Sequence, residues 1–209
     1  MDNIPYPASC IRYPVSGIQP RTLYPVILPV PEQDRPLTGR EKVKLLSGHA
    51  RRALEMSAQK TGIILKELQK DKNGAPLPFN GNYWSLTHKT CYVGAVVAFN
   101  RIGIDIEKIR PCSEALFKKT ADIREWNLAD ARSPALFFRY WTAKECVLKA
   151  AGTGIRDLKK CRIVQLVDDR NLVITYQDKT WYIEHLFFDG HIASVVKNDL
   201  DVQWILSPN

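Results

Sequence analysis

The chain has 209 residues, 45% of them hydrophobic and 25% charged, which is enough to bury a core as one domain or two small ones. Its net charge of +8 favours anionic partners: nucleic acid, phosphorylated cofactors or acidic proteins. No apolar run approaches the roughly 20 residues that span a bilayer, and the N-terminus lacks the basic and apolar regions of a signal peptide. We therefore expect a cytoplasmic protein with no membrane partner.

The five cysteines indicate neither a disulfide framework nor a zinc site, because their number is odd and no pair has Cys-x-x-Cys spacing. Cys91 and Cys146 lie in apolar segments, so we expect both to be small core residues.

Proline dominates the first 36 residues, which hold eight of the 13 prolines and predict a Pro-rich arm (residues 1–36) instead of a helix. Within that arm, residues 24–30 predict one edge strand, where proline is tolerated. Thr38 and Glu41 form a capping-box pattern that predicts a helix from there to about Ala58. Its apolar stripe is expected to contain Val43, Leu46, Ala50, Ala53 and Leu54.

The middle of the chain reads as short strands with short connections. Residues 61–68 predict a strand, and a loop rich in turn-forming residues follows. Three further strands are expected at 83–87, 92–100 and 102–107, forming an antiparallel block because no crossover helix fits between them.

The second half begins with a helical stretch of poor periodicity at 113–129. Ser133 and Pro134 then predict the start of a helix that ends near Ala151, before Gly152. Four strands should close an antiparallel sheet: 161–167, 171–177, 180–187 and 191–197. The sequence thus predicts an α+β protein with an N-terminal half (37–101), a C-terminal half (102–209) and a cleft where they meet.

Four side chains in two segments point to phosphate chemistry. Asp105 and Glu107 share one face of a strand, and Glu145 and Lys149 share one stripe of a helix. Three carboxylates and a lysine on two rigid elements suit Mg²⁺ and a polyphosphate. Taken alone, each pair also fits an ordinary half-exposed strand or a surface ion pair.

His88 ends an apolar strand between Thr87 and Lys89. A lone histidine there is most often a polar strand-end residue, but these three neighbours together are also donors suited to a phosphate.

These segments together resemble one family. Gly103 to Glu107, Trp141-x-x-Lys144-Glu145-x-x-x-Lys149, Trp84-x-x-Thr87-His88 and Gly74-x-Pro76 stand in the order and rough spacing of 4'-phosphopantetheinyl transferases. The likeness is closer to the larger type, which activates surfactin synthetase and holds two similar halves in one chain. It implies an α+β fold with two pseudo-two-fold-related halves, each a small antiparallel sheet with helices, and a monomer.

The resemblance implies transfer of phosphopantetheine from coenzyme A to a serine of an acidic apo acyl or peptidyl carrier protein, releasing 3',5'-ADP. Asp105, Glu107 and Glu145 match the Mg²⁺ ligands, and Glu145 also matches the base that deprotonates the serine. The cofactor-binding residues implied are Arg52, Lys72, Thr87, His88, Lys144 and Lys149, the last of them near the pyrophosphate.

Several positions depart from the family pattern, two of them near the expected cofactor contacts. Thr87 replaces the commoner serine and keeps a hydroxyl, whereas Ala75 stands where a basic residue is frequent. The loss at Ala75 keeps open a second hypothesis, a non-catalytic protein of the same fold that binds coenzyme A or a carrier. A nucleic-acid-binding module rests on basicity alone and lacks zinc-finger spacing, an aromatic RNA-binding motif or a dense basic helix.

Overall fold

The computed structural model describes residues 21–32, 37–72 and 74–207, and within them the chain is α+β, as expected. Most of the predicted Pro-rich arm lies outside the described residues. The helices are α1 (Gly39–Thr61), α2 (Glu114–Thr120), α3 (Ile123–Trp126), α4 (Pro134–Ala151) and the 3₁₀ turn η1 (Ile155–Asp157). The strands are β1 (Thr22–Leu23), β2 (Val26–Pro29), β3 (Tyr83–His88), β4 (Tyr92–Ala98), β5 (Ile104–Lys108), β6 (Arg162–Leu166), β7 (Asn171–Tyr176), β8 (Lys179–Phe188), β9 (His191–Val196), β10 (Asp201–Val202) and β11 (Ile205–Leu206).

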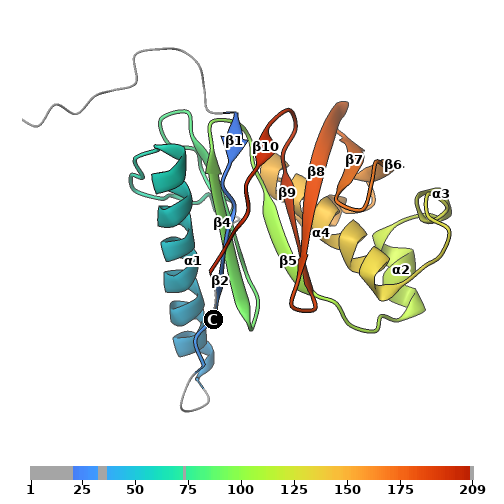
Figure 1. Ribbon diagram of the computed structural model, residues 1–209, viewed down its shortest axis with the longest axis horizontal. Coiled ribbons are helices and arrows are strands. Elements are labelled where there is room, and N and C mark those ends of the chain that lie inside the picture. Colours follow the sequence, from blue (N-terminus) through green and yellow to red (C-terminus); the bar gives the residue numbers. More distant parts are fainter. Residues whose placement is uncertain (1–20, 33–36, 73, 208–209) are drawn as a thin grey trace, which may run out of the picture.

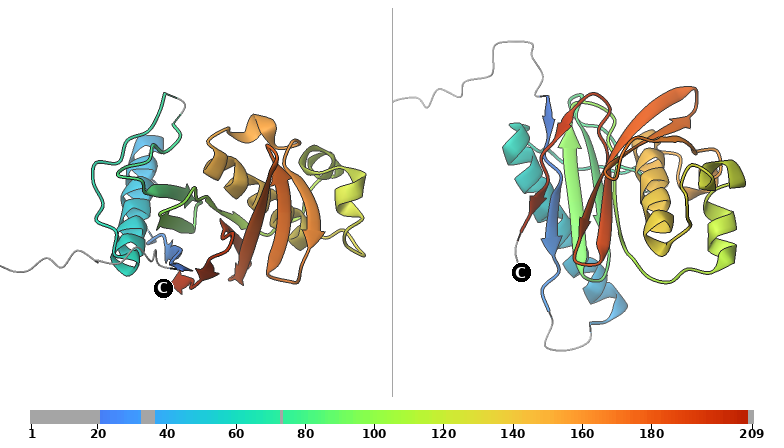
Figure 2. Two further views of the ribbon diagram at one scale, coloured as in Figure 1. Left: turned by 90° about the horizontal axis from the view of Figure 1, so that it is seen from above. Right: turned by 45° about the vertical axis from the view of Figure 1, so that its right-hand side comes forward.

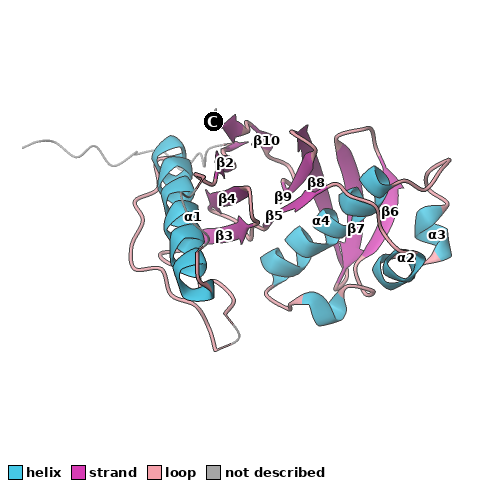
Figure 3. Cartoon of the chain, turned by 90° about the horizontal axis from the view of Figure 1, so that it is seen from below, coloured by secondary structure: helices cyan, strands magenta, loops and turns pink. Residues whose placement is uncertain are grey.

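Two main sheets stand side by side, each with one long helix (Figure 1). The first has the strand order β11-β2-β4-β3, and the second has the order β5-β9-β8-β7-β6 and is antiparallel throughout. Helix α1 lies against the first sheet and α4 against the second (Figure 3). The first two and the last two described strands pair with each other: β11 pairs with β2 in the first sheet, and β10 pairs with β1 in a separate two-stranded sheet.

Helix α1 follows its local signals. Thr38 and Glu41 form the capping box, and Gly62 ends the helix in the left-handed conformation with its N–H bonded to Ala58 and Gln59 carbonyls. Of the predicted stripe, four residues are buried against the sheet: Leu46, Ala50, Ala53 and Leu54. Val43 is 61% exposed, because the first turns of α1 extend past the end of the sheet (Figure 1).

Three strand predictions in the first 110 residues were wrong. The strand at β2 forms but is not an edge strand, since β11 pairs along its outer side. Residues 63–69 carry no strand: the chain leaves Gly62 without a sheet partner, and only Ile63 is buried there. Strand β5 does not join β3 and β4, because it pairs antiparallel with β9 in the second sheet.

The predicted helical stretch 113–129 divides into α2 and α3. Asp122 separates them by capping α3, accepting hydrogen bonds from the backbone N–H groups of Arg124 and Glu125. The four C-terminal strands and the Ser133-to-Gly152 helix were predicted correctly.

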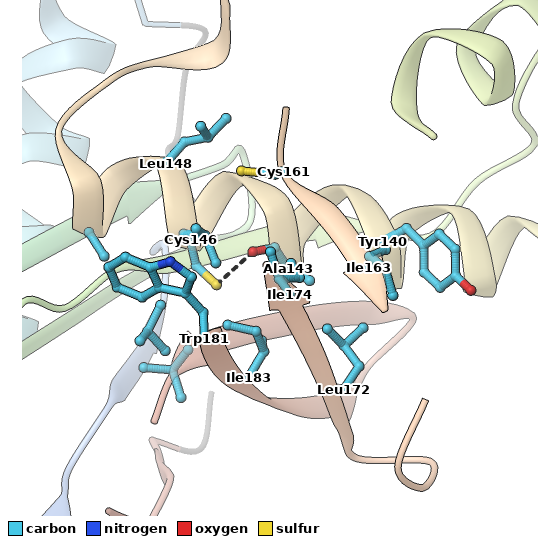
Figure 4. Close-up of a cluster of buried hydrophobic side chains, with 14 of the residues drawn as sticks. Tyr140, Ala143, Cys146, Leu148, Cys161, Ile163, Leu172, Ile174, Trp181 and Ile183 are labelled. Atoms are coloured by element: carbon cyan, nitrogen blue, oxygen red, sulfur yellow. Dashed lines mark hydrogen bonds between the residues drawn. The ribbon is translucent and has the colours of Figure 1, made fainter. Parts of the chain in front are cut away.

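Helix α4 packs closely on the second sheet, and its inner face forms the largest core (Figure 4). Cys146 is fully buried in that core, whereas Cys91 is exposed, contrary to our expectation, at the turn between β3 and β4. Gly103 permits the close contact with β5: a Cβ there would lie 1.8 Å from the Cys146 carbonyl oxygen. Only glycine fits this position, so it fixes how near α4 comes to β5.

No helix in the described part of the chain is both long enough and apolar enough to cross a membrane.

Candidate functional site

The site lies where β3, β5 and α4 meet, and its centre is Asp105. Although it alternates with the core residues Ile104 and Ile106, Asp105 is itself only 3% exposed, because α4 and β3 also pack on β5. Lys149 Nζ donates to Asp105 Oδ1 at 2.8 Å and to the Ile104 carbonyl at 2.9 Å. Thr87 Oγ1 donates to the same Asp105 oxygen at 3.0 Å.

The second oxygen of Asp105 is left open. Its Oδ2 atom is buried and has no hydrogen-bond partner among the described residues. A buried carboxylate oxygen without a partner is unfavourable unless something binds it, so this atom marks a place for a cation or a water.

Glu107, two residues along β5, pairs with Lys89 from the start of the β3–β4 turn, at 2.7 Å between Oε1 and Nζ. Burial alone lowers the pKa of Lys89, but Asp105 and Glu107 outweigh it and the pKa is raised. Lys89 therefore stays charged and neutralises the outer part of the acidic strand.

Glu145 on α4 is half-buried and shares the electrostatic surroundings of Asp105 and Glu107. Burial, followed by the nearby Asp105 charge, raises the pKa of Glu145, while Lys149 and Lys89 oppose the shift. A carboxylate with a raised pKa is a better proton acceptor than an ordinary glutamate.

A cleft of about 590 Å³ opens beside this cluster, and Glu145 and Lys149 line it. One wall comes from the N-terminal half, with residues 70 and 74–76 and strand β3, and the other comes from α4 and residues 152–156. The charged lining residues are three cations and one acid: Lys70, Lys149, Arg156 and Glu145. The cleft between strand β3 and helix α4 therefore has a positively charged lining.

His88 is exposed at the end of β3. Burial of part of its ring lowers its pKa, and the positive charges of Lys149, Lys89 and Lys70 lower it further. The histidine thus lies in a cationic environment of the kind that attracts a phosphate.

Not every residue implied by the family reaches this site. Lys144 is contradicted as a cofactor contact: it is fully buried, donates to the Thr120 carbonyl at 2.8 Å and pairs with Glu125 at 2.5 Å. Arg52 lines a different hollow, along the outer side of α1. Lys72 is exposed in the loop before β3 but is not part of the cleft lining, whereas Lys70 is.

Sequence reasoning missed several cleft residues. Ser85 lines the cleft and fixes β5 by accepting a hydrogen bond from the Ile104 N–H at 3.2 Å. The Trp84-Ser85-Leu86 segment alternates in the manner of a strand, which was a usable signal for Ser85. Lys70 and Arg156 lie in loops, where periodicity gives no direction to a side chain.

The fit to a divalent cation rests on the donor set and the open oxygen of Asp105. In the described ranges, no three His, Cys, Asp or Glu side chains are gathered closely enough to hold a metal ion as they stand. Lys89 and Lys149 instead pair with Glu107 and Asp105. Carboxylate oxygens are the ligands Mg²⁺ prefers, so Asp105, Glu107 and Glu145 have the chemistry that suits it.

Comparison with known proteins gives a family match for part of the chain. Residues 101–196 match the model of the 4'-phosphopantetheinyl transferase superfamily. The chain is similar to 4'-phosphopantetheinyl transferase HetI of Nostoc sp. (strain PCC 7120), with 40% identity over 91 residues that cover 40% of this chain and 38% of that protein. It is also similar to a 4'-phosphopantetheinyl transferase of Bacillus subtilis, with 28% identity over 100 residues that cover 46% of this chain and 45% of that protein.

Residues 101–196 therefore match the 4'-phosphopantetheinyl transferase superfamily, which confirms the resemblance expected from the motifs within that segment. The chain matches less than half the length of each relative. Asp105, Glu107, Glu145 and Lys149 fall inside the matched segment, and Thr87, His88 and Lys70 fall outside it.

Proposed function

We propose that this protein transfers 4'-phosphopantetheine from coenzyme A to a serine of an apo carrier protein and releases 3',5'-ADP. One observation carries the proposal: Lys149 and Thr87 both donate to Oδ1 of Asp105 beside a positively lined cleft, inside or next to the segment that matches the superfamily.

The open oxygen of Asp105 supports a divalent cation at this point, with Glu107 and Glu145 as further ligands. When bound, Mg²⁺ supplies positive charge that stabilises the pyrophosphate as its bond breaks. Thr87 and Lys149 hold the Asp105 side chain so that its second oxygen faces the ligand.

Glu145 serves as the general base. Its carboxylate accepts the proton of the serine hydroxyl, the serine oxygen bonds to the β-phosphorus of coenzyme A, and the bond from that phosphorus to the bridging oxygen breaks. The bridging oxygen leaves with the electron pair as part of 3',5'-ADP. Lys149, bonded to Asp105 and facing the cleft, is placed to offset charge on the pyrophosphate.

The family pattern also leads us to propose a pseudo-two-fold relation between the halves and a cytoplasmic monomer. Each half contains a sheet and one long helix, α1 on the first and α4 on the second, which supports the relation (Figure 2). The net charge of +8 suits an acidic acyl or peptidyl carrier as partner through long-range steering. Arg52 and Lys72 stay predictions as cofactor contacts.

The second candidate function is binding of coenzyme A without catalysis. Ala75, which lines the cleft where the family often has a basic residue, favours it. The Asp105–Lys149 arrangement and Glu145 beside it favour the enzyme.

The test mixes the purified protein with coenzyme A, Mg²⁺ and an apo acyl carrier protein, and weighs the carrier by intact mass spectrometry. We expect the carrier to gain one phosphopantetheine, and the gain to disappear with EDTA and with Glu145→Ala. If no acyl or peptidyl carrier gains mass while calorimetry shows coenzyme A binding, the non-catalytic candidate replaces the enzyme.

A further inference from the structure

A row of polar side chains crosses the apolar interface between α4 and the second sheet. Asp105, Ser194 and His185 lie side by side on the adjacent strands β5, β9 and β8, since Ser194 is paired in register with both of the others. Thr142 of α4 meets this row at Ser194, with 2.5 Å between the two hydroxyl oxygens. Thr142 and Ser194 are 0% exposed and His185 is 1% exposed. Polar groups this deep in a core need hydrogen-bond partners.

Arg139 enters the same interface one turn earlier on α4, and it is 8% exposed. Its Nη2 atom donates to the carbonyls of Asp168 and Asn171, at the turn between β6 and β7. The backbone N–H of His185 donates to the Arg170 carbonyl of the same turn at 2.7 Å. One turn of the backbone therefore holds Arg139 and His185 next to each other, from opposite sides of the interface.

Arg139 and His185 each have one buried side-chain nitrogen that no described residue bonds. These atoms are Arg139 Nε and His185 Nε2. An arginine Nε always carries a hydrogen, so it is a donor without an acceptor. The role of His185 Nε2 depends on the tautomer of the ring, since a neutral imidazole has one donor nitrogen and one acceptor nitrogen.

The neighbouring hydroxyl groups determine that tautomer. Thr142 Oγ1 donates to the Phe138 carbonyl at 2.8 Å, so its single proton is used and it accepts from Ser194. Because the Ser194 proton is then used as well, Ser194 Oγ accepts from Nδ1–H of His185 at 2.8 Å. Burial, followed by the Arg139 charge, lowers the pKa of His185 well below 6.5, so the ring is neutral at physiological pH. Nδ1 therefore carries the ring proton, and Nε2 is an acceptor without a donor.

We propose that a water molecule binds between Arg139 Nε and His185 Nε2. Its oxygen accepts from the Arg139 N–H, and one of its hydrogens donates to the His185 nitrogen, so both buried atoms are satisfied. A buried water needs about two to four polar partners, and these side chains supply one donor and one acceptor. An anion does not suit the site, because it would face the lone pair of His185 Nε2.

The water completes a hydrogen-bonded chain that anchors α4 on the second sheet. Both ends of the chain are on α4, at Arg139 and Thr142, and its middle is on β8 and β9. Glu145 lies one turn beyond Thr142, so the chain holds the part of the helix that carries Glu145. No ligand of the cleft takes part in the chain, which therefore forms whether or not the protein is a transferase.

The first measurement is the tautomer of His185 in the wild-type protein. Long-range proton–nitrogen NMR spectra of protein labelled at its histidine nitrogens separate a ring nitrogen that carries a proton from one that does not. The His185→Gln variant identifies the signals. We expect the proton on Nδ1 at neutral pH. A proton on Nε2 would make both free nitrogens donors and would overturn the proposal.

A crystal structure at neutral pH, from crystals grown in sodium bromide, tests the identity of the ligand. We expect density for one water at hydrogen-bonding distance, about 3 Å, from both nitrogens. A bromide peak at this position in the anomalous map, a direct bond between the two nitrogens, or an absence of density would each overturn the proposal.

Ser194→Ala tests the chain, because it removes the acceptor of the His185 Nδ1–H group. We expect a mixture of the two ring tautomers in this variant. Ser57→Ala is the matched control: Ser57 is also 0% exposed, but it belongs to α1 and accepts from the Val97 N–H. The control should keep the wild-type tautomer. A pure Nδ1–H tautomer in Ser194→Ala, or a mixture in the control, would overturn the proposed chain.

Hydrogen exchange of the α4 amides measures the anchoring. Ser194→Ala should speed exchange at residues 142–149 by about fivefold, the effect of one lost hydrogen bond, and leave α1 as in the wild type. Ser57→Ala should speed exchange in α1 and leave α4 unchanged. Normal α4 protection in Ser194→Ala, or an equal loss in both helices, would show that the chain does not hold α4 and would overturn that part of the proposal.

Discussion

Helix α4 carries two lysines that each bond to a backbone carbonyl and a carboxylate, yet the two arrangements differ in what they leave open. Lys144 binds the Thr120 carbonyl and Glu125, and the pair is buried, with side chains 0% and 5% exposed. Lys149 binds the Ile104 carbonyl and Asp105, and its side chain is 28% exposed toward the cleft.

The carboxylates show the difference most clearly. Both oxygens of Glu125 are satisfied, Oε1 by Lys144 and the Ile163 N–H and Oε2 by the Asp122 N–H. Asp105 uses one oxygen twice and leaves the other without a partner in the described structure. A closed pair contributes to folding, whereas an open carboxylate at a cleft is available to a ligand.

The largest expected effect is the loss of activity on changing Asp105, the carboxylate that pairs with Lys149. Asp105→Asn keeps an oxygen that Lys149 and Thr87 can bond but removes the negative charge. We expect kcat/KM for carrier modification to fall by about a thousandfold or more, because the charge that holds the cation and orients Lys149 is lost. The free energy of unfolding should change by about 1 kcal/mol or less. Both are measured on the same preparation, and a large stability loss would contradict the comparison.

Breaking the buried Lys144–Glu125 pair should lower stability and leave activity nearly unchanged. Lys144→Met leaves Glu125 buried without its counter-charge, which destabilises by about 3–5 kcal/mol. The Lys144→Met protein that does fold should retain near-normal kcat/KM, since Lys144 does not line the cleft. Urea unfolding and activity at low temperature separate the two effects. Adding Glu125→Gln to Lys144→Met should recover part of the stability; loss of activity in fully folded Lys144→Met would contradict the assignment.

The contact that brings both lysines into place is at Gly103. Gly103→Ala places a methyl group against the Cys146 carbonyl and should destabilise the protein by about 3 kcal/mol through overpacking. Gly48→Ala is the matched control, because a Cβ there has open space within α1. That substitution should stabilise by about 0.5–1 kcal/mol. Equal thermal shifts for the two variants would show that α4 does not depend on the close approach.

Lowering the pH should destabilise the folded protein through His185, a buried ring on β8 that bonds to Ser194 at 2.8 Å. Burial lowers its pKa well below 6.5; Arg139 lowers it further and Asp168 opposes. Because the unfolded chain binds this proton first, stability is full above pH 6.5 and falls below it. Compared with the His185→Gln variant, the wild-type protein should lose about 1.4 kcal/mol of its free energy of unfolding for each pH unit below 6.5. Parallel stability curves for the two proteins would contradict the prediction.

The smallest effect concerns Lys89, which holds Glu107 at 2.7 Å. Lys89→Met removes this competitor for the carboxylate, so half-maximal activity should need about threefold less Mg²⁺. Lys108→Met is the control, because it removes an exposed lysine from the same strand. An increased Mg²⁺ requirement in Lys89→Met would mean that Lys89 supports the site instead.

Features fixed by neighbouring residues were predictable from the sequence. The ends of α1 and α4 follow from Thr38, Glu41, Ser133, Gly62 and Gly152, because a cap depends on three or four adjacent residues. The pairing of strands within the sheets was less predictable from the sequence. Strand β5 leaves its sequence neighbours to pair with β9, nearly ninety residues away, and its own alternation cannot reveal that choice.

The site was also predictable only where it depends on neighbouring residues. Glu145 and Lys149 were found together because i and i+4 share a helix face, but Lys144 was assigned to the cofactor although it lies about 140° around the helix from Lys149. That angle was a usable signal. The burial of Asp105 was not, because it results from α4 and β3 covering β5.

The most direct test of the open carboxylate is a crystal structure with coenzyme A and Mn²⁺, a divalent cation that anomalous scattering locates. We expect a peak beside Asp105 Oδ2, with Glu145 near it, Lys89 moved off Glu107, and Lys144 still bonded to Glu125. A protein that binds coenzyme A with Mn²⁺ elsewhere, and the Lys89–Glu107 pair intact, would contradict the account.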